Sequence, residues 1–78
     1  MRTPNTQTGT APAILVYDGG PTQVFVNNKD ATNTLTLSIN GDSGAMTIES
    51  GGKRGVRING GIYSVILGGT AAFEVTTF

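Results

Sequence analysis

Short runs of apolar and β-branched residues recur along almost the whole of this 78-residue chain. Clusters of Gly, Asn, Asp and Ser separate the runs, and no stretch places apolar residues at helical spacing. The twelve glycines also argue against a helical bundle, because glycine destabilises helices. The pattern therefore predicts an all-β protein. The separating clusters are Asp18-Gly19-Gly20-Pro21, Asn40-Gly41-Asp42-Ser43-Gly44, Ser50-Gly51-Gly52, Asn59-Gly60-Gly61 and Gly68-Gly69-Thr70.

Seven strands are expected, and most of them alternate between apolar and polar residues, as a strand with one buried face does. The clearest is residues 34–39, where Leu35, Leu37 and Ile39 are predicted to face the core. Residues 13–17 and 62–67 are instead continuous apolar runs, which are typical of strands covered on both faces. The remaining alternating segments are residues 22–26, 45–49, 55–58 and 71–78.

Residues 1–12 form a separate region rich in Thr, Asn and Gln, with no large apolar residue after Met1. We expect an extended N-terminal arm there, mobile unless it lies on a partner, with a merely frayed terminus as the alternative. Residues 13–78 are expected to form one small β-sandwich domain. Immunoglobulin-like and jelly-roll topologies both fit this seven-stranded pattern.

The chain contains no His, no Cys and no Trp. It therefore lacks the commonest general base, the commonest metal ligand and the most reactive nucleophile, and we expect no enzyme, no cofactor and no metal site. A formal net charge of zero gives no reason to expect a nucleic acid or an anionic membrane as partner. No apolar segment follows Arg2, and the longest apolar run is far too short to span a bilayer, so we expect synthesis in the cytoplasm.

Two short motifs resemble catalytic or ligand-binding sequences. Gly41-Asp42-Ser43-Gly44 resembles the nucleophile segment of chymotrypsin-like serine proteases, but Ser43 has no His to take its proton, and the same residues are ordinary in a hairpin turn. Gly51-Gly52-Lys53-Arg54-Gly55 lacks the Ser or Thr and the following helix of a phosphate-binding loop. We interpret it as a basic turn that, together with Arg57, contacts an acidic partner.

The five carboxylates are dispersed along the sequence. A glycosidase-like pair would need two of them to meet beside a cleft, and so small a sandwich offers little cleft. A calcium site at Asp42 would lack the spaced acidic ligands of known calcium loops. The carboxylates are Asp18, Asp30, Asp42, Glu49 and Glu74.

Several strand-and-turn strings resemble small virion proteins of tailed bacteriophages, in particular the capsid decoration (cement) proteins. The resemblance covers about residues 24–76 and carries no individual functional residue across. The strings are Val26-Asn27-Asn28, Asn33-Thr34-Leu35-Thr36-Leu37-Ser38-Ile39-Asn40-Gly41, Met46-Thr47-Ile48-Glu49-Ser50-Gly51-Gly52, Gly61-Ile62-Tyr63-Ser64-Val65-Ile66-Leu67-Gly68-Gly69-Thr70 and Phe73-Glu74-Val75.

The resemblance implies a non-enzymatic protein on the outer capsid surface that bridges capsid subunits and stabilises the head. Its partners would be the major capsid protein or other virion proteins, and copies of the chain would associate, with a trimer as the guess. A phage tail, fibre or baseplate module is the first alternative, and a small carbohydrate-binding module with exposed aromatic residues is the second. The expected interface residues are Arg2, Thr3, Pro4, Asn5, Thr6, Gln7, Thr8, Lys53, Arg54, Arg57 and Phe78.

Overall fold

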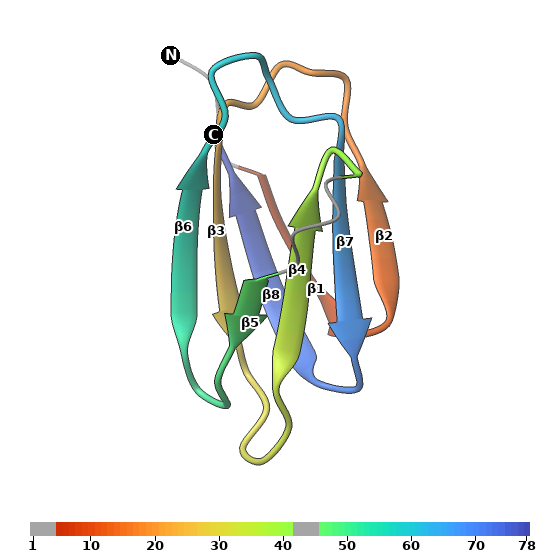
Figure 1. The fold of residues 1–78 in the computed structure, drawn as a ribbon, viewed down its shortest axis with the longest axis vertical. Helices are drawn as coiled ribbons and strands as arrows, with labels where there is room; N and C mark the ends of the chain where they lie inside the picture. Colours follow the sequence, from red (N-terminus) through yellow and green to blue (C-terminus); the bar gives the residue numbers. More distant parts are fainter. Residues whose placement is uncertain (1–4, 42–45) are drawn as a thin grey trace.

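A computed structural model describes residues 5–41 and 46–78, which form two four-stranded antiparallel sheets packed face to face (Figure 1). The all-β prediction is confirmed, with eight strands in these described ranges instead of the seven expected. Sheet A has the order β1-β8-β3-β6, and sheet B has the order β2-β7-β4-β5. Sheet A contains β1 (Asn5–Thr10), β3 (Gln23–Asn28), β6 (Lys53–Arg57) and β8 (Ala72–Thr77). Sheet B contains β2 (Ala13–Val16), β4 (Leu35–Ile39), β5 (Met46–Ile48) and β7 (Ser64–Gly69).

The core lies between the two sheets and is built from the alternating residues of both. The expected inward faces of β3, β4 and β8 are confirmed, since the inward side chains of these strands are buried and their neighbours are not. Burying these aliphatic side chains is the main favourable contribution to folding. The core residues are Ala11, Val24, Val26, Leu35, Leu37, Ile39, Ile48, Ile62, Val65, Leu67, Ala71, Phe73 and Val75.

The additional strand is β1, which comes from the segment expected to be a separate arm. Its residues 5–10 pair with residues 72–77 of β8, so this segment belongs to sheet A. Alternation did not predict this strand because Asn5, Gln7 and Gly9 occupy its inward-facing positions, opposite Thr77, Val75 and Phe73. Threonine-rich segments favour strands. Hydrogen bonds to β8 satisfy about half of the backbone amides and carbonyls of β1.

The connections place β2 and β6 at the two opposite sides of the sandwich (Figure 1). Successive strands change sheet at every step except from β4 to β5. Strand pairs β1–β8, β2–β7, β3–β6 and β4–β5 are therefore related as in one long hairpin that is folded over on itself. As a result β2 ends sheet B on one side, and β6 ends sheet A on the other.

Asn40 joins two loops at one end of the sandwich. Its side-chain carbonyl accepts hydrogen bonds from the Tyr63 and Ser64 amides at 2.6 and 3.2 Å, and its side-chain amide donates to the Gly61 carbonyl at 3.0 Å. Asn40 and Gly41 have φ values of 56° and 73°, so both take the left-handed conformation that a tight hairpin requires. The rest of that predicted hairpin, residues 42–45, lies outside the described residues, as do the protease-like Ser43 and the calcium candidate Asp42.

Candidate interaction surface

The outer face of sheet B exposes large apolar side chains next to one another. Ile14 and Val16 of β2 are 68% and 78% exposed, and Ile66 of β7 is 37% exposed. Ile14 and Ile66 are directly paired across the two strands, so their side chains share one face. Single exposed apolar residues are ordinary, but a cluster on one sheet face marks a place where contact with another surface is favourable.

The rest of this face is small and uncharged. The four strands of sheet B contain no charged residue. Gly68 of β7 lies so close to the Thr36 hydroxyl that a Cβ atom at Gly68 would collide with it, which keeps the centre of the face flat. We call the outer face of β2, β7, β4 and β5 the neutral face. Its outward residues are Ile14, Val16, Thr36, Ser38, Thr47, Ser64, Ile66 and Gly68.

The neutral face was not among the sequence-based predictions, although two apolar runs in the sequence indicate it. The apolar runs at residues 13–17 and 62–67 predicted two strands covered on both faces. The structure covers only the inner face of each, because no other element of the described chain lies on the outer side of sheet B (Figure 1). The prediction of cover on both faces was therefore wrong for both strands, because Ile14 and Val16 of β2 and Ile66 of β7 are exposed.

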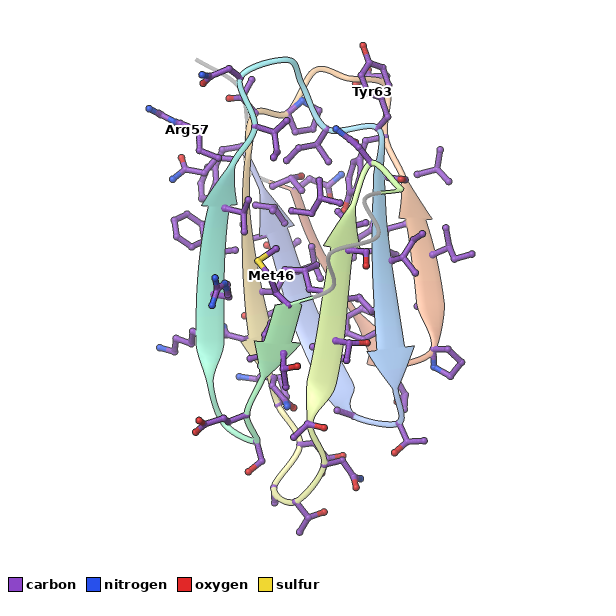
Figure 2. The ribbon with its side chains drawn as sticks, in the orientation of Figure 1. Met46, Arg57 and Tyr63 are labelled. Atoms are coloured by element: carbon purple, nitrogen blue, oxygen red, sulfur yellow. The ribbon has the colours of Figure 1, made fainter. Side chains whose placement is uncertain are left out.

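The edge strand β6, on the opposite side of the sandwich from β2, is cationic. Lys53, Arg54 and Arg57 all belong to β6 and are exposed, and Figure 2 shows Arg57 directed away from the sandwich. Arg54 is paired with the buried Val26, so it occupies an inward-facing position on an edge strand. Lys53 and Arg54, together with Glu49 on the approach to β6, line an open pocket of about 250 Å³ between β5 and β6.

The residues expected to form one interface are spread over the molecule. Asn5, Thr6, Gln7 and Thr8 lie in β1, at the opposite edge of sheet A from the three cations of β6. Thr6 shares a hydrogen bond of 3.0 Å with Thr76 of β8. Arg2, Thr3 and Pro4 lie outside the described residues.

Phe78 continues the last strand and packs within the domain. Its ring meets that of Phe25 edge-on, with 5.6 Å between centroids and 87° between ring planes. Its amide donates to the Gln23 carbonyl at 2.9 Å, and its own carbonyl accepts from the Thr22 amide at 2.8 Å. These contacts fix Phe78 against β3 and leave Phe25 45% exposed on the outer face of sheet A.

Tyr63 is the other exposed aromatic residue, at 55%. Its ring lies over Gly19, where a Cβ atom would clash with it, and Figure 2 shows it near the start of β7. Phe25 belongs to the outer face of sheet A, so these two rings do not share a surface. A planar aromatic platform for sugar rings is therefore not assembled from Phe25 and Tyr63.

The surroundings of Asp30 and of Tyr17 shift the pKa values of these two side chains. Hydrogen bonds from the backbone amides of Thr32 and Asn33 hold the pKa of Asp30 at about 2, and this carboxylate organises the β3–β4 loop. Burial raises the pKa of the Tyr17 hydroxyl, an effect that the nearby Thr77 hydroxyl only partly offsets. Among the described residues, the Tyr17 hydroxyl has no partner at hydrogen-bonding geometry.

Neither a metal centre nor a membrane helix is present in the described part of the chain. No three His, Cys, Asp or Glu residues gather there, and no helix there has the length and apolar character needed to cross a bilayer. Comparison with protein-family models, with curated proteins and with solved structures finds no match to this chain.

Proposed function

We propose that this chain is a non-enzymatic structural protein of a phage virion, a decoration protein that binds the outer capsid surface and bridges capsid subunits. The observation that carries the proposal is the neutral face. A sandwich with a complete core still exposes Ile14, Val16 and Ile66 together, on a sheet without charge. Such a surface suits a protein whose role is to hold other surfaces together.

The strand order supports a jelly roll as the finer topology. Pairing β1 with β8, β2 with β7, β3 with β6 and β4 with β5 is what two interlocked Greek keys produce. In an immunoglobulin-like sandwich the first two strands are neighbours in one sheet, whereas β1 and β2 are in different sheets here. Jelly rolls occur in viral capsid and lectin domains, so the topology is compatible with a virion role without demonstrating one.

The virion part of the proposal is drawn from the resemblance to phage decoration proteins, and the size of the chain agrees with it. A domain of 78 residues without disulfides gains stability when it binds a partner. On a capsid many copies bind symmetrically, so weak individual contacts add up through avidity. The partner would be the major capsid protein, and copies of the chain would contact each other there.

The test uses particles of the phage whose genome encodes this chain. Purified DNA-filled heads should contain the protein, and heads assembled without it should release DNA at a lower temperature. Adding back the purified protein should restore heat resistance. Heads that lack the protein, or whose heat resistance is the same without it, would contradict the proposal, whereas recovery of the protein only with tails would favour a tail, fibre or baseplate module.

Matched variants test whether the neutral face makes the contact. Ile66→Lys places a charge in the middle of the neutral face and should abolish the restored heat resistance. Thr8→Lys places the same charge on the outer face of sheet A, within the segment first expected to be an arm, and should restore heat resistance as the natural protein does. The reverse result would move the contact from the neutral face to β1.

A further inference from the structure

The free edge of β2 presents backbone groups that have no partner in its own sheet. The Tyr17 amide, just after β2, donates a hydrogen bond to the Tyr63 carbonyl at 2.8 Å. The backbone amide and carbonyl of Tyr17 therefore point toward β7. Because backbone groups alternate along a strand, the amides and carbonyls of Ala13 and Leu15 also point to β7. Those of Ile14 and Val16 point to the open side, where β2 is the last strand of sheet B.

The side chains of this edge give no protection against pairing with another strand. Natural edge strands are blunted by charge, by proline or by a bulge. Ile14, Leu15 and Val16 are all apolar, and the four residues of β2 pair with β7 in unbroken register. Pro12 precedes β2, so its missing amide hinders pairing with another strand only at the start of β2.

We propose that a second copy of this chain is the partner of this edge, and that the two β2 strands pair antiparallel about a twofold axis at Leu15. Ile14 then lies opposite Val16 of the second copy, and Val16 lies opposite its Ile14. In this register the open amides and carbonyls of both residues are hydrogen-bonded across the axis. Sheet B becomes one continuous sheet through both copies, with Ile14, Val16 and Ile66 of each in a single apolar strip.

A second copy fits this edge because the pairing is self-complementary. Each hydrogen-bonded cross-strand pair joins Ile14 to Val16, two β-branched apolar side chains, which is a favourable combination in sheets. No charge on sheet B opposes the approach of an identical sheet. The twofold contact also closes on itself, because both copies use the same strand. The other edge of sheet B, β5, has only three residues and offers little length for a further strand.

The other long edges of the molecule are less suited to this pairing. If β6 paired with its own copy about Gly55, Lys53 would lie opposite Arg57 of the second copy, and like charges directly opposite destabilise a sheet. The edge of β1 is uncharged, but its side chains are Asn, Thr, Gln and Gly, so pairing there would bury little apolar surface.

Sedimentation equilibrium of the pure chain over a wide concentration range tests this proposal. The natural protein should pass from monomer to dimer as concentration rises, and Val16→Lys should raise the dissociation constant by at least about tenfold, or about 1.4 kcal/mol. Thr8→Lys, which adds the same charge at the edge of sheet A, should leave the dissociation constant unchanged. Circular dichroism should show that both variants keep the all-β fold, since Val16 and Thr8 are exposed.

Val16→Pro is an independent variant, because proline removes an amide that points to the open side of β2 and has no acceptor among the described residues. It should also weaken dimerisation while the monomer stays folded. A monomer at every concentration, a trimer, or a dimer that Val16→Lys and Val16→Pro leave intact would overturn the proposal. These measurements use the protein alone, so they stand or fall separately from binding to a capsid.

Discussion

The two outermost strands of this sandwich, β2 and β6, face opposite sides and carry opposite kinds of sequence (Figure 1). Strand β6 contains Lys53, Arg54 and Arg57, whereas β2 contains only Ala, Ile, Leu and Val. Both strands end a sheet, so both leave backbone groups open to pairing. Charge discourages a second strand at β6, and nothing discourages one at β2. The difference supports the proposal that β2, and not β6, is the edge that pairs with a second copy.

The largest expected effect separates residues that hold the fold from residues that only face outward. Leu67→Ala removes a fully buried side chain of β7 and should lower the free energy of unfolding by about 2–5 kcal/mol. Val16→Ala on the adjacent β2 should lower it by less than about 1 kcal/mol in dilute protein, because Val16 is exposed. Urea denaturation measures both values. A large loss for Val16→Ala would show that this side chain serves the monomer fold.

The second prediction removes the protection of β6. The triple variant Lys53→Thr, Arg54→Val and Arg57→Thr should associate through β6 at concentrations where the natural protein does not. Light scattering at matched concentration measures the change, with the charge-conserving Lys53→Arg as control. If the triple variant scatters light as the natural chain does, the cations of β6 do not act as a barrier to pairing.

These comparisons also show how far the sequence predicts the structure. Alternation identified the inner faces correctly wherever the partner is the domain's own core, as in Leu35, Leu37 and Ile39. It missed β1, because this strand has polar residues at its inward positions and is held by pairing with the distant β8. It predicted that both faces of β2 are covered, because a continuous apolar run indicates that both faces are apolar. Such a run does not indicate whether the same chain or another molecule covers them.

The third prediction concerns acid and the carboxylate of Asp30, which lies in the loop between β3 and β4 and in neither β2 nor β6. Asp30 has a folded-state pKa of about 2, below its ordinary value of 3.8. A depressed pKa stabilises the folded state above the ordinary value, and that stability is lost as pH falls from about 4 to about 2. Asp30→Asn should flatten this part of the stability profile, measured by thermal unfolding at several pH values. If the Asp30→Asn profile is the same as that of the natural protein, Asp30 is not the source of the stability lost in acid.

The smallest expected effect concerns Tyr17, which directly follows β2. Its buried hydroxyl lacks a partner among the described residues, so Tyr17→Phe should leave stability unchanged or raise it by up to about 1 kcal/mol. Burial raises the pKa of this hydroxyl, so its protonated form is favoured in the folded state. The stability difference between the two proteins should therefore change in favour of Tyr17→Phe as pH rises above 10. A clear loss of stability at neutral pH would instead reveal a hydrogen bond through this hydroxyl.

Amide hydrogen exchange, measured residue by residue at low and at high protein concentration, tests the difference between the two edges most directly. We expect the Ile14 and Val16 amides to exchange rapidly in dilute solution and to become protected as concentration rises. The open amides of Lys53, Gly55 and Arg57 on β6 should exchange equally fast at both concentrations. Rapid exchange of Ile14 and Val16 at every concentration, or protection that appears on β6 instead, would contradict the assignment of β2 as the contact edge.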